Sequence, residues 1–287
     1  MSQVDLHIHT TASDGSLTPR DIVRKASEEG FKVISITDHD SVSGLEEGLV
    51  AGEEFQIKVI PGVELSVNHE SGSLHLLGYG FDIDNSEIIE NLKCVVNSRQ
   101  DRNRKILRKL EKLGCLLTEE DVKAVSGEGT MGRGHIATVL IQKGYVSSVK
   151  EAFDSFLTYG GPAYVDRFRL EMKTSIEMIH RAGGVAVWAH PGLHTISLEK
   201  LIGMLPLWAA NGLDGLESDY GQHSIALRDR LRVLALENKL IFTGGSDFHG
   251  DLKPDVNLGN GPEGELIDPI CAESLIARLR EVQQNLK

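Results

Sequence analysis

Seven short apolar runs recur along the chain, and each is followed by a helical pattern or by a polar loop. They cover residues 4–8, 33–37, 58–63, 73–79, 184–189, 212–217 and 240–244. Strands that alternate with helices are typical of α/β proteins, because each parallel connection needs a long crossover. The pattern therefore predicts an α/β fold, and a parallel barrel in preference to a β-sandwich.

Signals for the first helix support this interpretation. Thr18 precedes Pro19, an order typical of a helix N-cap and first helical position, and Gly30 follows the expected end of the helix. The helical spacing predicts a buried face made by Ile22, Val23 and Ala26. With 287 residues, 40% of them hydrophobic, the chain is long enough for one large barrel or two ordinary domains.

Residues 84–170 interrupt the alternation, because helical patterns cover 87–113, 118–125, 135–143 and 148–157. We expect a barrel built from residues 1–83 and 171–287. Residues 84–170 are expected to form a helical insertion after the fourth strand that contributes to substrate recognition. The charged face of residues 87–113 is predicted to be solvated surface rather than a binding patch.

Composition argues against several classes of protein. The net charge of −12 disfavours binding of long duplex nucleic acid, whose phosphates need Lys and Arg partners, but it is compatible with a small phosphorylated ligand. Without a run of ~18 apolar residues or a basic N-terminal segment, we expect a cytoplasmic protein with no membrane contact. The three cysteines are widely spaced and odd in number, so a disulfide framework is not expected.

Six histidines and three carboxylates lie at or near the ends of the predicted strands, where a barrel places its active site. A single histidine there would more often be a hydrogen-bonded core residue, but nine coincident positions favour a metal cluster. Imidazole and carboxylate suit zinc, manganese or iron. The candidate ligands are His7, His9, Asp14, His39, Glu64, His75, His190, Asp247 and His249.

Five motifs of the chain resemble those of the polymerase and histidinol phosphatase (PHP) superfamily. They are His-Ile-His at 7–9, Thr-Asp-His-Asp at 37–40, Pro-Gly-Val-Glu at 61–64, Ala-His-Pro at 189–191 and Gly-Ser-Asp-Phe-His at 245–249. The resemblance covers the barrel portion almost from end to end. It implies a distorted (β/α)7 barrel that holds two or three divalent metal ions and hydrolyses phosphate esters with metal-bound water.

The resemblance also implies how the ligands divide among the metals. A first metal would take His7, His9, Glu64 and Asp247, a second Glu64, His75 and His190, and a third Asp14, His39 and His249. In the histidinol phosphatase branch a histidine usually stands at the place of Asp14, so this carboxylate disfavours histidinol phosphate as the substrate. An alternative is that Asp14 only makes an Asx turn with Gly15.

Other polar residues near these motifs have open roles. Asp38 and Asp40 flank His39, and either could orient a ligand or make a local turn or cap. His194 follows His190 by four residues, so it is a candidate for protonating the leaving alkoxide, with an ordinary loop residue as the alternative. His69 and His180 have no partner motif and are expected to be surface or packing residues.

The insertion carries a second motif, Met-Gly-Arg-Gly-His at 131–135. It places Arg133 just before a predicted helix, whose electropositive N-terminus suits a phosphate, although a glycine-flanked arginine is also common in loops. With residues 160–165 it resembles the PHP subgroup that acts on nucleotides. Those enzymes remove the 3′-phosphate of 3′,5′-bisphosphonucleotides or trim short RNA from its 5′ end. Arg133 and His135 would then bind the phosphate distal to the metals.

The sequence therefore predicts a phosphoric ester hydrolase that acts on a small phosphorylated nucleotide, most specifically on the 3′-phosphate of a 3′,5′-bisphosphonucleotide. Manganese, zinc and iron are all compatible with the ligands. The alternatives are a 5′–3′ exonuclease on short oligoribonucleotides, a histidinol-phosphate phosphatase, and a non-catalytic metal-binding module of the kind attached to DNA polymerases. Retention of all nine candidate ligands argues against the last of these.

Overall fold

The structure, a computed structural model, describes residues 3–69, 72–127, 131–193 and 197–285. One mixed sheet dominates this part of the chain, with the strand order β1-β2-β3-β4-β6-β7-β8 and a short β5 that pairs with β3. The strands are β1 Gln3–Ile8, β2 Phe31–Ile36, β3 Lys58–His69, β4 Gly72–Tyr79, β5 Leu170–Glu171, β6 Val185–Trp188, β7 Gly215–Tyr220 and β8 Ile241–Gly245.

The two edges of the sheet meet and nearly close a barrel. Beyond the end of β8, the Asp247 N–H donates to the His7 carbonyl at 2.9 Å. The His9 N–H donates to the Phe248 carbonyl, also at 2.9 Å. These bonds bring the candidate ligands of the first and last strands together. The predicted α/β class and distorted barrel are confirmed.

The expectation of an all-parallel barrel is wrong for β4. This strand pairs antiparallel with both β3 and β6, whereas the β1–β2, β2–β3, β6–β7 and β7–β8 pairs are parallel. β3 ends at His69 and β4 begins at Gly72, which leaves no room for the dozen or more residues of a parallel crossover. Because β4 runs in reverse, His75 in its first half lies beside the carboxyl end of its neighbours.

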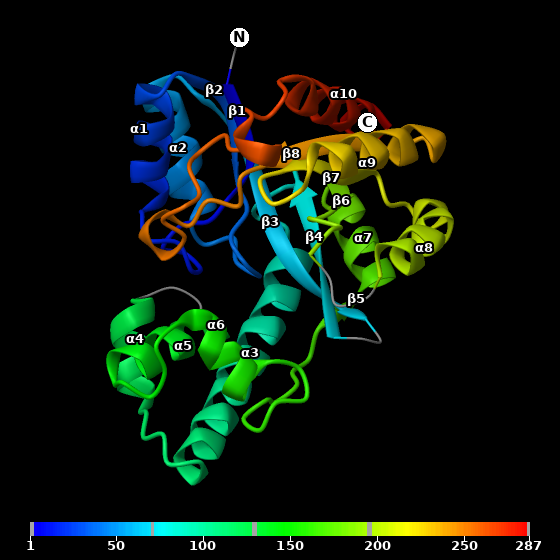
Figure 1. Ribbon diagram of the computed structural model, residues 1–287. Helices are drawn as coiled ribbons and strands as arrows, with labels where there is room; N and C mark the ends of the chain where they lie inside the picture. The colour runs from blue at the N-terminus through cyan, green and yellow to red at the C-terminus, as the bar shows by residue number, and fades with distance from the viewer. Residues whose placement is uncertain (1–2, 70–71, 128–130, 194–196, 286–287) are drawn as a thin grey trace.

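Helices pack around the barrel (Figure 1). They are α1 Pro19–Glu28, α2 Leu45–Phe55, α7 Met172–Arg181, α8 Leu198–Ala210, α9 Ile225–Glu237 and α10 Ile270–Asn285. The sequence signals of α1 are confirmed, since the Thr18 side chain accepts a hydrogen bond from the Asp21 N–H and Pro19 is the first helical residue. Its predicted apolar face, Ile22, Val23 and Ala26, is fully buried.

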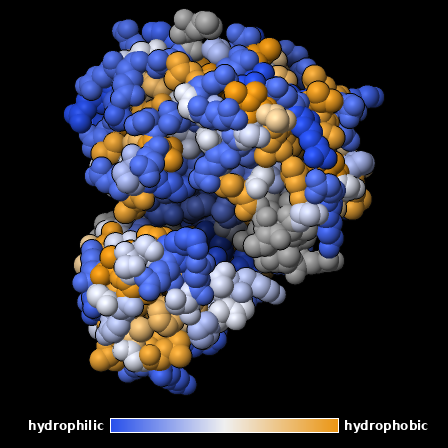
Figure 2. All heavy atoms as spheres, in the orientation of Figure 1, coloured by the Kyte–Doolittle hydropathy of each residue, from blue (hydrophilic) through white to orange (hydrophobic). Residues whose placement is uncertain are grey.

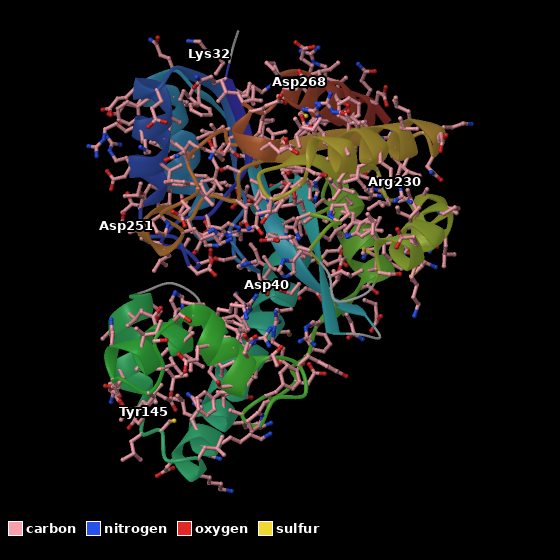
Figure 3. The ribbon with its side chains drawn as sticks, in the orientation of Figure 1. Lys32, Asp40, Tyr145, Arg230, Asp251 and Asp268 are labelled. Atoms are coloured by element: carbon pink, nitrogen blue, oxygen red, sulfur yellow. The ribbon has the colours of Figure 1, made fainter. Side chains whose placement is uncertain are left out.

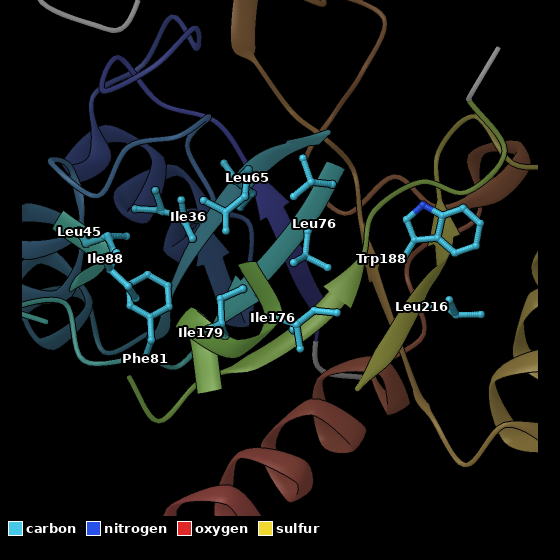
Figure 4. Close-up of a cluster of buried hydrophobic side chains, with 14 of the residues drawn as sticks. Ile36, Leu45, Leu65, Leu76, Phe81, Ile88, Ile176, Ile179, Trp188 and Leu216 are labelled. Atoms are coloured by element: carbon cyan, nitrogen blue, oxygen red, sulfur yellow. The ribbon is translucent and has the colours of Figure 1, made fainter. Parts of the chain in front are cut away.

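The barrel core lies between the sheet and these helices (Figure 4). Side chains of β2, β3 and β4 pack in it with α2, α7 and the first turns of α3. Trp188, the largest fully buried side chain, also packs edge-on against Trp208 of α8. This packing fixes the strands whose ends carry the candidate ligands.

The predicted helical insertion is present and hangs from the barrel after β4 (Figure 1). Its elements are α3 Ser86–Lys112, α4 Glu119–Ser126, α5 Arg133–Gln142, α6 Val149–Ala152 and a π-helical turn at Phe153–Leu157. Residues between 106 and 165 form a hydrophobic cluster of their own, while Ile88, Leu92 and Val95 of α3 belong to the barrel core. One helix therefore serves both cores, and a domain boundary at residue 84 stays a prediction.

In the stretches of chain described above, every helix is too short or too polar to span a lipid bilayer.

Closure of the barrel depends on the absence of a side chain at Gly245. A Cβ placed there would lie 2.1 Å from His7 Cβ and 2.6 Å from the His7 backbone nitrogen. We predict that Gly245→Ala destabilises the fold by about 3 kcal/mol or more, measured by denaturant unfolding. The control is Gly203→Ala in α8, where a Cβ meets nothing within 4 Å, so that the helix should gain up to about 1 kcal/mol. Equal stability of the two variants would contradict this account of closure.

Candidate metal centre

Glu64 lies at the centre of the site, with imidazoles around both of its carboxylate oxygens. It is almost fully buried, in the middle of β3. Its Oε1 lies 2.6 Å from His75 Nδ1 and 2.9 Å from His190 Nε2. Its Oε2 lies 2.9–3.3 Å from nitrogen atoms of three more imidazoles, those of His7, His9 and His39. A carboxylate in this position is suited to bridge two cations.

Several buried ligand atoms of this cluster have no hydrogen-bond partner among the described residues. They are His7 Nε2, His9 Nε2, His39 Nδ1 and Glu64 Oε2. Leaving a buried polar atom unpaired costs about 1–3 kcal/mol. A bound cation would accept the lone pairs of these atoms and so remove this cost. The side chains present therefore fit a metal site.

Three overlapping groups bring their ligand atoms within 4.8 Å of one another. These groups are His7, His9, Glu64 and Asp247; His39, Glu64 and His75; and His9, Asp14, His39 and His249. The first equals the predicted first ligand set, and the third adds His9 to the predicted third set. The second contains His39 in place of His190. Even so, His190 Nε2 lies 3.3 Å from His75 Nδ1 and contacts Glu64, so the nine predicted side chains occupy one site.

Asp14 takes part in the third group at the edge of the cluster. One of its oxygens lies 3.5 Å from His249 Nε2 and 3.6 Å from His9 Nδ1. The backbone N–H groups of Gly15 and Ser16 donate to the carbonyls of Thr10 and His249 rather than to the Asp14 side chain. The observed backbone hydrogen bonds therefore do not support the alternative of an Asx turn.

Neighbouring polar side chains hold the candidate ligands in place by hydrogen bonds. Glu217 of β7, which is fully buried, accepts a hydrogen bond from His7 Nδ1 at 2.9 Å and another from the His190 backbone N–H at 2.7 Å. A carboxylate acceptor keeps the proton on Nδ1 and leaves the Nε2 lone pair of His7 directed at the centre. Asp247 Oδ2 accepts from the Tyr220 hydroxyl at 2.9 Å and from Lys253 Nζ at 2.6 Å.

The backbone is strained at three positions that follow strands and face the site. Asp40, His190 and Asp247 have φ values of 51°, 28° and 58°, in the left-handed region that non-glycine residues rarely adopt. Such conformations persist where the surrounding structure enforces them, and they cluster at functional sites. Here they turn the chain so that the side chains after β2, β6 and β8 point inward.

Electrostatics at the centre favour ionised carboxylates. Burial alone would raise the pKa of Glu64, but the surrounding histidines lower it well below its usual value. Burial likewise raises the pKa of Asp247, but the Lys253 ammonium and nearby histidines lower it well below its usual value. Burial lowers the pKa of His75 to about 4, so this imidazole is neutral at pH 7. Burial alone would lower the pKa values of His7, His9 and His39, but nearby carboxylates outweigh it and raise them, so a cation would displace protons from these imidazoles when it binds.

Two adjoining pockets open above the centre, in the hydrophilic hollow between barrel and insertion that Figure 2 shows. The first, which we call the metal-side pocket, has a volume of about 340 Å³ and is lined by His39, Glu64, His75, Arg133, His190, Leu193, Tyr220, Gln222, Asp247 and Lys253. The second, the arginine pocket, has a volume of about 150 Å³ and contains Arg99, Arg102, Arg133, Arg167 and Arg169. Arg133, His39 and His75 line both.

The arginine pocket is strongly cationic. Neither Arg102 nor Arg133 forms an ion pair with a carboxylate of the described residues: Arg102 donates to Asn103 and Arg133 to the Leu157 carbonyl. Burial and the neighbouring guanidinium groups hold the pKa of Arg102 well below its usual value. An anion in this pocket would offset the repulsion.

Asp40 ties the insertion to the barrel beside the arginine pocket. Figure 3 labels it where the two parts meet. Its carboxylate accepts from Arg99 of α3, from Arg167 at 3.2 Å and from the Ser66 N–H at 2.8 Å. Asp40 therefore orients two arginines of the pocket. Its neighbour Asp38 instead orders the loop after β1 through Thr10 and Ser13.

Four other histidines were named from the sequence, and the structure describes the side chains of two of them. His135 is buried and accepts a hydrogen bond from the Gly132 N–H, and it lines neither pocket, so its phosphate contact stays a prediction. His180 contacts Asp214 at 2.7 Å, which agrees with a packing role. His194 lies outside the described residues, and the side chain of His69 is likewise not described.

Several polar residues at the site were not identified from the sequence, namely Glu217, Tyr220, Lys253, Arg99, Arg102, Arg167 and Arg169. Glu217 stood at a predicted strand end, so the rule that selected the candidate ligands could also have identified it as a residue of the site. The prediction of a solvated α3 face is wrong for Arg99 and Arg102, which are buried. Their burial results from contacts with the barrel and with the 166–169 segment, which helical spacing does not encode.

Comparisons with known proteins agree with this geometry. The PHP domain model matches residues 5–175. A 5′-3′ exoribonuclease from Haemophilus influenzae is 36% identical over 85% of this chain and 89% of its own length. The chain belongs to the PHP family. A second PHP relative, a 3′,5′-nucleoside bisphosphate phosphatase from Chromobacterium violaceum, is 30% identical over 94% of each chain.

A solved structure supports both the fold and the chemistry. The crystal structure of a protein described as a metal-dependent phosphoesterase, from Bifidobacterium adolescentis, has 31% sequence identity, a TM-score of 0.84 and 96% coverage of both chains. The resemblance to PHP proteins read from the motifs is thus confirmed, and with it a metal-dependent phosphoesterase that hydrolyses phosphoric esters.

Because Glu64 contacts five imidazoles, Glu64→Gln should remove most of the bound metal and lower turnover more than about 100-fold. The amide has nearly the same shape but carries no charge to bridge cations. Metal content of the purified variant and its circular dichroism would be measured together. As a graded control, Glu217→Gln should weaken metal binding by about 10- to 100-fold, since it acts only through His7 and His190. Full metal content and turnover in Glu64→Gln would remove Glu64 from the centre.

Asp14→Asn separates a ligand role from a turn role, since asparagine makes the same local turns but is a poorer metal ligand. We expect one metal site to weaken selectively, with activity recovering at high Mn²⁺ concentration. Metal titration of the variant is the measurement. Wild-type behaviour at limiting metal would favour a purely structural role.

Proposed function

We propose that the protein hydrolyses a phosphate monoester of a small nucleotide that carries a second phosphate, most specifically the 3′-phosphate of a 3′,5′-bisphosphonucleotide. The observation that carries the proposal is the arginine pocket next to the candidate metal centre. A monophosphate ligand would leave this pocket without an anion. A bisphosphate offers one phosphate to each pocket.

The nine candidate ligands would hold two or three divalent cations, of manganese, zinc or iron. Bound cations would activate water for attack on phosphorus and neutralise charge on the phosphoryl oxygens. Glu64 keeps the ligands together, Glu217 fixes the orientation of His7, and Asp40 fixes two arginines. The side chains are thus positioned before the substrate arrives, which is the condition for electrostatic catalysis.

The arginine pocket would bind the phosphate that does not react. Gly132 and Gly134 at the N-terminus of α5 line it, so the positive end of this helix lies beside the guanidinium groups. Binding energy from this remote phosphate can position the scissile phosphate for in-line attack. Arg133 borders both pockets and is fixed by Leu157 and by stacking near Phe153 and Tyr164.

A second candidate is 5′–3′ exonucleolytic cleavage of short RNA. It is favoured by the H. influenzae relative, which is named a 5′-3′ exoribonuclease. A terminal 5′-phosphate in the arginine pocket would place the next phosphodiester at the metals, so the same site serves both reactions. Histidinol phosphate has a single phosphate and leaves the arginine pocket without a ligand.

Arg102→Met tests the two-phosphate model. Arg102 lines only the arginine pocket of the two, and methionine keeps most of its length without the charge. Loss of a charge-assisted contact of about 1.5–3 kcal/mol should lower kcat/KM for adenosine 3′,5′-bisphosphate by roughly 10- to 150-fold. Hydrolysis of adenosine 3′-monophosphate should change by less than about 3-fold.

The matched control is Arg104→Met, two residues along the same helix. Arg104 is half exposed, pairs with Glu119 and lines neither pocket. This variant should leave kcat/KM unchanged for both substrates. Equal losses on both substrates in Arg102→Met would overturn the assignment of the second phosphate to the arginine pocket.

A further inference from the structure

We infer that Lys253 binds the phosphoryl group that is hydrolysed and is a catalytic residue of this enzyme. The inference rests on the proposed function in one respect: it needs a phosphoryl group in the metal-side pocket. It adds a residue that neither the motifs nor the comparisons assign.

Lys253 lies in the segment after β8 that also carries Asp247 and His249. Its side chain is 34% exposed, and it lines the metal-side pocket together with Glu64 and His190 but does not line the arginine pocket. Its charge therefore faces the space beside the candidate metal centre. The arginines other than Arg133 face the neighbouring pocket.

The contact with Asp247 positions the ammonium group without using all of its hydrogen atoms. Lys253 Nζ donates to Asp247 Oδ2 at 2.6 Å, and Asp247 is its ion-pair partner among the described residues. An ammonium group has three donors. The other two are available to a ligand in the pocket that the side chain lines.

Holding Asp247 in place by a hydrogen bond would not by itself require a lysine at position 253. The two oxygens of Asp247 have different neighbours, because Oδ1 lies 3.1 Å from His9 Nε2 while Oδ2 faces Lys253 and Tyr220. The Tyr220 hydroxyl already donates to Oδ2 at 2.9 Å. Lys253 adds to this a positive charge that reaches the pocket.

A fixed cation is useful at this place in the reaction. Hydrolysis forms a bond between the water oxygen and phosphorus and breaks the bond from phosphorus to the ester oxygen. The electron pair of the broken bond remains on the ester oxygen, which receives a proton from the consumed water. Throughout, the phosphoryl oxygens carry negative charge that Lys253 can neutralise while it stays protonated. The contact depends on the scissile group alone, so it serves mono- and bisphosphate substrates alike.

The experiment compares Lys253→Met with Lys253→Arg and Tyr220→Phe in the metal-loaded protein. Lys253→Met should lower kcat/KM roughly 10- to 100-fold for both adenosine 3′,5′-bisphosphate and adenosine 3′-monophosphate, and should weaken inhibition by inorganic phosphate by a similar factor. Lys253→Arg keeps the charge and should recover part of kcat/KM and part of the inhibition by phosphate. Tyr220→Phe removes the other hydrogen bond to Asp247 Oδ2 but no charge, so it should weaken inhibition by phosphate much less than Lys253→Met does. Metal content is measured for each variant.

Two results would overturn the inference. If Lys253→Met and Tyr220→Phe lost metal to the same extent and kept the inhibition constant for phosphate, Lys253 would only support Asp247. If Lys253→Met affected the bisphosphate alone, Lys253 would bind the remote phosphate. Failure of the wild-type protein to hydrolyse either nucleotide would instead refute the proposed substrate class. In that case calorimetric binding of inorganic phosphate to the metal-loaded protein and its Lys253→Met variant still decides the role of Lys253.

Discussion

The buried carboxylate of Glu64, surrounded by five imidazoles, is the constraint on which the rest of the structure depends. An ionised carboxylate is costly to bury unless it is paired, and the histidines within or just after β1, β2, β4 and β6 meet it only when the barrel is closed. The left-handed backbone at His190 and Asp247 and the close approach of Gly245 to His7 all serve this convergence. Fold and chemistry therefore share one set of contacts.

Much of this arrangement could be predicted from the sequence, because strand ends of a barrel meet at one face whatever their distance along the chain. All nine candidate ligands were selected in this way and lie together in the structure, and motif resemblance correctly indicated the family. The direction of β4 was missed even though the predicted strands 58–63 and 73–79 are separated by too few residues for a parallel crossover. The direction of β4 could have been predicted from the length of the loop, but not from the hydrophobic pattern.

The arginine pocket could not be predicted, for a physical reason. Arg99 and Arg102 lie on a helix that also carries exposed charged residues such as Lys105 and Arg108. The local sequence pattern does not distinguish the buried arginines from the exposed residues. They become buried because Asp40 of the barrel and the 166–169 segment of the insertion both contact α3. The candidate metal centre can thus be located from the ends of strands, whereas the arginine pocket is formed by tertiary contacts.

The long helix α3 belongs to two hydrophobic cores and carries two of the pocket's arginines between them. Ile88, Leu92 and Val95 anchor its start in the barrel, and Ile106, Leu107 and Leu110 anchor its end in the insertion. Exchanging the insertion with that of another PHP protein at residue 84 would therefore remove a piece of the barrel's own core. A chimaera that keeps the barrel intact would have to join the two parents within this helix, between residues 95 and 106, and would have to choose from which parent Arg99 and Arg102 come. The connection between barrel and insertion therefore lies within a helix rather than in a loop.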